Sequence, residues 1–403
     1  FQPSPLMVEH KRAGDSLKPH DQAIAKPGAE PPQPEAMDIR ARLPAWLTHD
    51  WFLGLALAAA VFVAYLPALP GQFIWDDDSW TTDIFRLLKD FSGLRAIWLD
   101  PMALQQYFPI SGTSFWIDYQ LWQFATLPSH IENVLLHVAA ALLFVKLLRR
   151  LQVPGAWLAG AIFTLHPLSV ESAAWITERK NMLSLVFYLL ALLAYGKLAN
   201  LWPANTATAA EVASPQRWKI YAFALLLGIA ALLAKATAFS LPPVMLLLCW
   251  WKRGRIRWRA DVLPTLPFFA LAIGHGLMMI WMEKHHLGTQ GPEWSMSFLE
   301  RCLIAGRALW FYLGKLSWPA QLCFIYPRWQ MDPRSLVQWL YPISAVAVLA
   351  ALWLARKRIG RGPVTAGLFF VGTLLPMLGF INGYFLRFSF VCDHWTCHSS
   401  LAP

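Results

Sequence analysis

The stretch HPLSVESAAWITERKNML, residues 166–183, is a polar segment set between two apolar runs. AWLAGAIFTL (156–165) precedes it, and SLVFYLLALLAYG (184–196) follows it. A membrane-spanning helix needs about 20 mostly apolar residues, and ionisable side chains buried at its ends are costly unless they are paired or functional. The pattern therefore predicts two membrane helices, joined by a charged connection that is a candidate functional segment.

The composition of the whole chain also indicates a membrane protein. Of its 403 residues 57% are hydrophobic and 14% are charged, against about 25% charged in soluble globular proteins. The mean hydropathy is +0.41. The 34 Lys and Arg residues exceed the 24 Asp and Glu residues, an excess that typically anchors cytoplasmic loops at lipid headgroups. We predict an all-α polytopic membrane protein that contacts membrane lipids and no nucleic acid.

Nine apolar segments are candidate membrane spans. A tenth segment, 299–317, is ambiguous because it carries four charged residues and could lie along the membrane interface. The nine candidates are 51–70, 131–148, 155–170, 182–199, 219–234, 237–251, 262–282, 339–355 and 363–381.

Four basic clusters follow predicted spans, at 146–150, 217–219, 252–259 and 356–361. Basic loops favour the cytoplasm, so an inside N-terminus and a non-crossing 299–317 place all four on one side. The C-terminus is then outside. Three connections face outward with it: a long first loop of about 71–130, the segment 166–183, and about 283–339. The functional site is expected on this outer face.

The ends of the chain differ from its apolar middle. Residues 1–44 begin with Phe1 and are rich in Pro and polar residues, which predicts a disordered cytoplasmic segment with Met37 as a candidate start. Residues 45–395 form the predicted transmembrane domain, and 396–403 form a short tail. A 34-residue helical repeat is not found in the sequence.

The cysteines show no spacing typical of a zinc site. A disulfide between Cys392 and Cys397 is one alternative, in an oxidising compartment, and free thiols are the favoured one. The five cysteines are Cys249, Cys302, Cys323, Cys392 and Cys397.

Three consecutive carboxylates, Asp76, Asp77 and Asp78, follow the first predicted span in FIWDDDSW. Neighbouring like charges raise one another's pKa, and a partly desolvated carboxylate is a good proton acceptor near neutral pH. The same triplet could hold a divalent cation such as Mg²⁺ or Ca²⁺ with further oxygen ligands. A third interpretation is a solvated acidic turn that keeps the loop outside the membrane.

The segment 166–183 supplies the second cluster. If it is helical, Glu171, Trp175 and Glu178 share one helix face, and Arg179 and Lys180 lie beside that face. Cations together with a helix N-terminus make an anion site suited to a phosphate. The alternative is that Glu178 pairs with the neighbouring cations and only fixes the helix end.

Further ionisable residues lie at other membrane boundaries. Lys235 lies between apolar segments, where an unpaired cation is costly. Arg387 and Asp393 follow the last predicted span and either anchor it by snorkelling or face the site.

Five motifs together resemble a family. The set resembles the membrane half of bacterial tetratricopeptide-repeat membrane proteins, which are similar to the transmembrane-and-tetratricopeptide-repeat (TMTC) O-mannosyltransferases of the GT-C glycosyltransferase superfamily. The motifs are FIWDDD (73–78), HPLSVESAAWITERKNMLS (166–184), LLAKATAFSLPPVMLLLCWW (232–251), GRALWFYLGKLSWPAQLCFIYPRW (306–329) and YFLRFSFVCDH (384–394).

This resemblance implies a GT-C-like helical bundle that transfers a sugar from a polyprenyl-phosphate carrier to an acceptor protein or glycan. The sugar is a hexose such as mannose, and the implied location is the outer face of a bacterial inner membrane, with no resident cofactor. Asp76 and Asp77 correspond to the family's catalytic acidic motif. The implied donor-phosphate and substrate residues are His166, Glu171, Glu178, Arg179, Lys180, Lys235, Arg387 and Asp393.

Two other functions remain alternatives at this point. A transporter or flippase for lipid-linked saccharides would place charges and broken helices near the middle of its spans. Here the charges gather at outer ends, apart from Lys235. The other alternative is an inactive membrane scaffold that lacks its repeats, since the sequence after Cys392 reads DHWTCHSSLAP.

Overall fold

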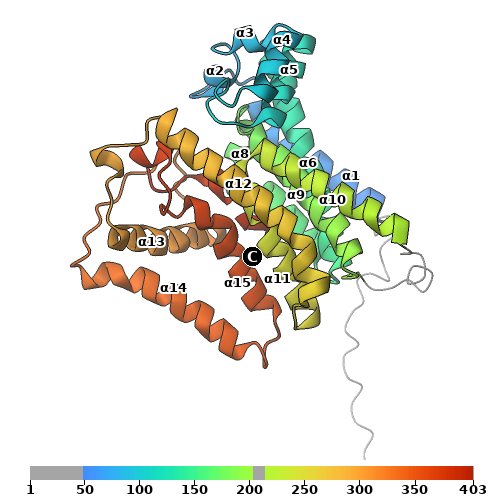
Figure 1. The fold of residues 1–403 in the computed structure, drawn as a ribbon, viewed down its shortest axis with the longest axis vertical. Helices are drawn as coiled ribbons and strands as arrows, with labels where there is room; N and C mark the ends of the chain where they lie inside the picture. The colour runs from blue at the N-terminus through green and yellow to red at the C-terminus, as the bar shows by residue number, and fades with distance from the viewer. Residues whose placement is uncertain (1–48, 203–213, 403) are drawn as a thin grey trace, which may run out of the picture. The chain divides into compact units, whose positions relative to one another are not determined.

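The structure is a computed structural model that describes residues 49–202 and 214–402. Within these residues it contains α-helices, short 3-10 and π segments and no β-strand, which confirms the all-α prediction (Figure 1). Residues 49–402 belong to one compact unit. The segment 1–44, predicted to be disordered, lies outside the described residues.

Each of the nine predicted spans contains a helix. Six helical stretches are long and apolar enough to cross a membrane: Asp50–Ala68, Thr126–Arg150, Arg179–Leu198, Gln216–Ala234, Trp258–His285 and Leu336–Ala355. Shorter helices occupy the other three predicted spans, which confirms a polytopic helical membrane protein. The nine helices are α1 (Asp50–Tyr65), α6 (Thr126–Arg150), α7 (Ala156–Leu165), α9 (Arg179–Leu198), α10 (Ser214–Ala234), α11 (Leu241–Arg253), α12 (Leu263–His285), α14 (Leu336–Ala355) and α15 (Gly362–Leu374).

Helix α9 is the innermost of the long helices. It packs against α6 and α10, and 61% of its apolar window is buried, whereas the window of α14 is not buried at all. Helices in lipid associate by close packing, which small residues permit. Gly160 of α7 illustrates this, because a Cβ there would lie 2.3 Å from Cγ2 of Val145 on α6. The polar start of α9 is therefore carried into the interior of the protein.

The predicted first outer loop is folded into short helices. They are α2 (Asp77–Trp80), α3 (Phe85–Leu88), α4 (Phe91–Leu99) and α5 (Pro109–Trp122), and they gather at the top of Figure 1. Buried apolar side chains join them to α12 in a core of their own, which includes Trp80, Leu88, Ile97, Phe115 and Met279. This small core fixes the aspartate triplet at the start of α2.

The ambiguous segment forms α13 (Phe298–Ser317), which begins with a capping box between Ser297 and Glu300. It packs along α14, and Gly306 permits the approach because a Cβ there would lie 2.4 Å from the Pro342 nitrogen. Its four charged residues keep it out of the set of six spanning-length apolar helices. That α13 does not cross the membrane stays a prediction.

The chain after α15 folds back into the bundle. Short 3-10 turns cover Tyr384–Arg387, Asp393–Thr396 and Ser399–Leu401, so the predicted tail is packed and not extended. Cys397 and His398 are buried there. All five cysteines are free thiols, as the favoured alternative predicted.

Candidate active site

Asp76 lies at the entrance of a polar cluster between α2 and α9. Its Oδ1 accepts a hydrogen bond from the Thr177 hydroxyl at 2.9 Å, and its Oδ2 lies 3.6 Å from Nζ of Lys180. The side chain stays 26% exposed, so part of the carboxylate faces outward. The preceding Trp75 has φ 51°, an uncommon and strained conformation for a bulky residue.

The other two aspartates point in different directions from Asp76. Asp77 is 1% exposed, and its two oxygens accept the backbone N–H groups of Ile74 (2.9 Å) and Thr177 (2.8 Å). Burial raises the pKa of Asp77 to about 6, although these two hydrogen bonds oppose the rise. Asp78 is exposed and accepts from the Thr82 hydroxyl. The triplet thus contains one exposed residue of α2 (Asp78), one buried acceptor (Asp77) and one partly exposed carboxylate (Asp76).

Glu178 ties two cations together beneath Asp76. Lys180 Nζ lies 3.0 Å from its Oε1, and Lys235 Nζ lies 2.8 Å from its Oε2. Burial alone would raise the pKa of Glu178, but His394, Lys180 and Lys235 outweigh burial and lower it. Lys235 is therefore paired, which explains how a cation is accommodated between two apolar segments. We call Asp76, Thr177, Glu178, Lys180 and Lys235 the Asp76 site.

Arg179 lies apart from this site, although it is the sequence neighbour of Lys180. Its guanidinium pairs with Asp118, lies 3.1 Å from Glu132 and donates to the Asn133 side chain (2.8 Å) and to the Ser129 carbonyl (3.2 Å). The side chain is fully buried. We call these five residues the Arg179 cluster; it joins α5 and α6 to α9.

The helix expected from Glu171 to Glu178 is interrupted. Helix α8 (Val170–Ala174) ends before Trp175, whose ψ of 123° is extended. Glu171 and Glu178 therefore do not share a helix face. His394 brings them together instead, because its Nδ1 lies 3.0 Å from Glu171 and its Nε2 4.0 Å from Glu178.

The remaining predicted residues lie at the margin. His166 bonds the Leu316 carbonyl at 3.1 Å, outside both clusters, and burial lowers its pKa. Asp393 accepts from the Tyr326 hydroxyl at 2.9 Å. Burial, followed by the charge of Glu171, raises the pKa of Asp393 to about 6.

Arg387 is the most open cation among the predicted site residues, with 38% of its side chain exposed. It pairs at 3.2 Å with Glu293, which is also exposed, and its guanidinium lies over the rings of Tyr384 and Phe388. Phe388 in turn contacts Trp75 at 5.6 Å between ring centroids. Phe388 thus lies between the exposed Arg387 and Trp75, the residue that precedes Asp76.

Aromatic rings form a rim on the same side. Trp75 contacts Phe324 at 5.4 Å, and Phe324 contacts Trp175 at 4.9 Å. Trp75 and Phe324 keep half and about a third of their surfaces exposed. Sequence reasoning missed Thr177, Trp75, Phe324 and His394. All four lie inside the quoted motifs, so their neighbours in the sequence were a usable signal.

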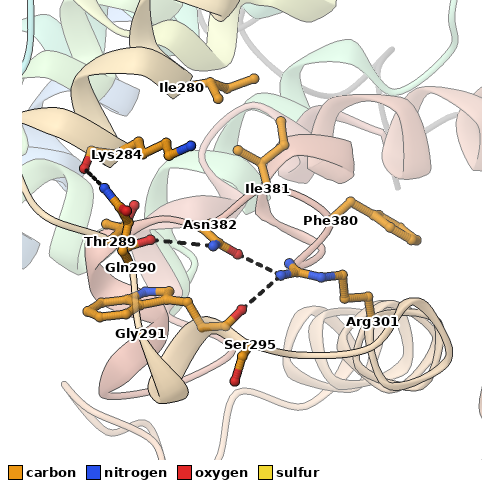
Figure 2. A pocket seen from close by; sticks show the side chains of 11 residues that line it. Ile280, Lys284, Thr289, Gln290, Gly291, Ser295, Arg301, Phe380, Ile381 and Asn382 are labelled. Atoms are coloured by element: carbon orange, nitrogen blue, oxygen red, sulfur yellow. Dashed lines mark hydrogen bonds between the residues drawn. The ribbon is translucent and has the colours of Figure 1, made fainter.

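A pocket of about 590 Å³ opens between the end of α12 and the loop after α15 (Figure 2). Arg301 closes one side by donating to Asn382 at 2.7 Å and to the Trp294 carbonyl at 3.1 Å. Trp294 also lies under the Arg387 guanidinium. In the described residues no cluster of three His, Cys, Asp or Glu side chains is placed to hold a metal ion.

Several known proteins similar to this chain are named protein O-mannosyl-transferases. Protein O-mannosyl-transferase Tmtc1 of Drosophila melanogaster is 31% identical over 225 residues, which are 52% of this chain and 24% of that protein. Protein O-mannosyl-transferase F38B6.6 of Caenorhabditis elegans is 31% identical over 158 residues, or 36% of this chain and 23% of that protein. The resemblance to the TMTC proteins is confirmed.

Tmtc2 of Drosophila melanogaster is 28% identical over 210 residues, which are 47% of this chain and 20% of that protein. The chain therefore spans about a quarter or less of the length of these relatives. No family model matches the chain. No solved structure matches it either, so the GT-C arrangement stays an implication of the resemblance.

Proposed function

We propose that this chain is the membrane part of a glycosyltransferase that moves mannose from a polyprenyl-phosphate carrier to a hydroxyl of an acceptor protein. The reaction takes place at the outer face of the membrane. The observation that carries the proposal is the half-open carboxylate of Asp76, held by Thr177 and Lys180 beneath a rim of aromatic rings. The named activity of the similar TMTC proteins agrees with it.

The transfer is a single displacement. The hydroxyl oxygen of an acceptor Ser or Thr forms a bond to the anomeric carbon while the bond from that carbon to the phosphate oxygen breaks. The electron pair of the broken bond leaves with the polyprenyl phosphate, and the hydroxyl proton passes to Asp76. Attack from the face opposite the leaving group inverts the anomeric centre.

Asp76 is the best placed of the three carboxylates for this role. Asp77 uses both oxygens to hold the backbone at Ile74 and Thr177 and has almost no exposed surface. Asp78 is solvated and has no cation beside it among the described residues. Asp76 keeps one oxygen on Thr177 and leaves the other near Lys180, so it is oriented but still accessible.

Lys180 and Arg387 have different roles in this proposal. Lys180 is buried against Glu178 and acts as a positioning residue, with its Nζ 3.6 Å from the Asp76 carboxylate. Arg387 contacts the donor phosphate, because its exposed partner Glu293 can be exchanged for a phosphate oxygen. The exposed rings of Trp75 and Phe324 lie against the apolar faces of the sugar.

The test is a transfer assay on the purified chain with radiolabelled polyprenyl-phosphate mannose and a Ser/Thr-rich acceptor protein. Asp76→Asn keeps the shape of the side chain but accepts no proton, so transfer should slow by about 10²–10⁴-fold. Donor binding, measured in parallel, should remain near the parent value. Asp78→Asn is the matched control and should transfer at nearly the parent rate.

The same assay separates the alternatives. A metal-dependent site would lose activity in a chelator and regain it with excess Mg²⁺, whereas the proposal expects equal rates with and without the chelator. A flippase would move the labelled donor across a vesicle membrane without transfer to protein. Transfer by Asp76→Asn at the parent rate contradicts the assignment of the base.

A further inference from the structure

A second pocket, of about 690 Å³, lies between the end of α11 and the turn that joins α14 to α15. This end of the bundle is at the bottom of Figure 1, whereas the first-loop helices α2–α5 are at the top. We call this second pocket the inner basic pocket. Its lining residues are Trp250, Trp251, Gly254, Trp353, Arg356, Lys357, Gly360 and Arg361.

Two guanidinium groups are fixed in this pocket. Arg361 donates from Nη1 to the Trp250 carbonyl at 3.3 Å, and Arg356 lies 4.1 Å from the ring centroid of Trp353. Gly254, with φ 74°, leaves the room for Arg361, because a Cβ there would lie 1.8 Å from Nη1. The third cation, Lys357, is exposed and forms no ion pair with a described residue.

The charge of the pocket is not balanced. None of its eight lining residues, all within the described part of the chain, is an acid. The neighbouring basic turn is different, because the buried Asp261 pairs there with Arg253 at 2.7 Å and with Arg257 at 3.4 Å. Three cations around one concave space therefore lack the carboxylate that their neighbours have.

The walls of the pocket are aromatic and apolar. Trp250 and Trp353 stack with centroids 5.3 Å apart and an interplanar angle of 11°. Tryptophan prefers the headgroup level of a membrane. Leu354 and Val346 on α14 are exposed beside it, at 76% and 68% of their surfaces. An exposed apolar helix face thus continues from the cationic pocket along α14.

We infer that the inner basic pocket binds the phosphate headgroup of an anionic phospholipid, with its acyl chains along α14. Arginine side chains recognise phosphate oxygens in pairs, and basic pockets between membrane helices accept anionic headgroups. A free phosphate ion would use the cations but not the exposed face of α14. The site is separate from the Asp76 site and does not depend on the proposed transfer.

The experiment is native mass spectrometry of the purified full chain, delipidated and titrated with phosphatidylglycerol or with phosphatidylcholine. The parent chain should retain phosphatidylglycerol in preference to phosphatidylcholine. Arg356→Gln/Lys357→Gln/Arg361→Gln should bind phosphatidylglycerol at least about tenfold more weakly. Trp353→Ala, which changes no charge, should weaken binding by a smaller factor.

The matched control removes three exposed cations at the ends of other helices, as Lys146→Gln/Arg150→Gln/Lys197→Gln. It loses the same net charge and should keep the parent affinity. Circular dichroism and a thermal melt check that each variant is folded. An equal loss in the control overturns the proposal in favour of general attraction to the membrane. Displacement of the lipid by millimolar inorganic phosphate overturns it in favour of a simple anion site.

Discussion

Arg179 and Lys180 are consecutive, cationic and buried, yet they serve different regions of the molecule. Arg179 points to α5 and α6, where Asp118, Asn133 and the Ser129 carbonyl use its donors. Lys180 points to Asp76 and Glu178, in a cluster that stays partly open. Successive residues on a helix are rotated by about 100°, so one motif supplies both regions.

The two clusters differ in whether their charged groups are all paired and buried or remain partly exposed. Every donor group of the Arg179 guanidinium has a partner, so this cluster holds α5 and α6 against α9. The Asp76 site keeps a partly exposed carboxylate, and the exposed cation Arg387 lies over Phe388, which contacts Trp75. Within one motif, Arg179 therefore stabilises the fold, whereas Lys180 positions the carboxylate proposed to act in catalysis.

The largest effect on stability is expected at Arg179. Arg179→Gln leaves Asp118 buried without its cation, and breaking a buried ion pair on one side typically costs about 3–5 kcal/mol. The midpoint of thermal unfolding in detergent should fall sharply, while the folded fraction still transfers sugar. Arg149→Gln, at an exposed ion pair with Asp50, is the control and should change the midpoint little.

Substitution of Lys180 should lower the transfer rate more than it lowers stability. Lys180→Met leaves Glu178 paired with Lys235 but removes the cation beside Asp76, so the transfer rate should fall by on the order of 10². KM for the donor should change less than kcat, and a merely structural role would not produce that split. Lys180→Arg should restore most of the rate. A parent kcat in the folded fraction of Lys180→Met would assign Lys180 to the fold alone.

A smaller effect is expected at the rim. Arg387→Gln removes one charge-assisted contact to the donor phosphate, which is worth about 1.5–3 kcal/mol, so KM for the donor should rise roughly tenfold or more. The value of kcat should change less. Arg334→Gln removes another exposed cation from the same outer region and should leave KM unchanged. Equal KM values for the two variants would remove Arg387 from the donor site.

The smallest predicted effect is a pH dependence of stability at Asp77. Its pKa of about 6 in the fold is above the usual value of 3.8, because burial favours the neutral form. The stabilisation is fully present below pH 3.8 and is lost as the pH rises through 6. Asp77→Asn should flatten this slope in thermal melts between about pH 4 and pH 6.5. Asp393→Asn should remove a separate part of the slope, since burial also raises the pKa of Asp393 to about 6.

The helices could be predicted from the sequence because long apolar runs leave little choice of structure. All nine predicted spans contain helices, and α9 begins at Arg179, within three residues of the predicted start. The first loop could not be predicted in the same way. Its helices α2 and α3 are four residues long, and Trp80 and Leu88 are buried through contacts with distant segments.

The site was predictable as a set of motifs but not as a geometry. The sequence places Arg179 beside Lys180, and only the folded chain shows that Asn133 and Asp118, 46 and 61 residues away, occupy Arg179. The break after Ala174 was also hidden, because VESAAWITE has no helix-breaking Gly or Pro. His394 joins Glu171 to Glu178 across more than 200 residues, and no local pattern indicates such a contact.

The most direct test of the account compares Asp76→Asn with Arg179→Gln in one experiment. Single-turnover mannose transfer is measured for both variants, normalised to the folded fraction from thermal melts on the same samples. The account predicts that Asp76→Asn keeps its melting midpoint and loses about 10²–10⁴-fold in rate. Arg179→Gln should lose stability and keep a normalised rate near that of the parent. A parent rate for Asp76→Asn, or a normalised rate for Arg179→Gln as low as that predicted for Asp76→Asn, would contradict the division between the two clusters.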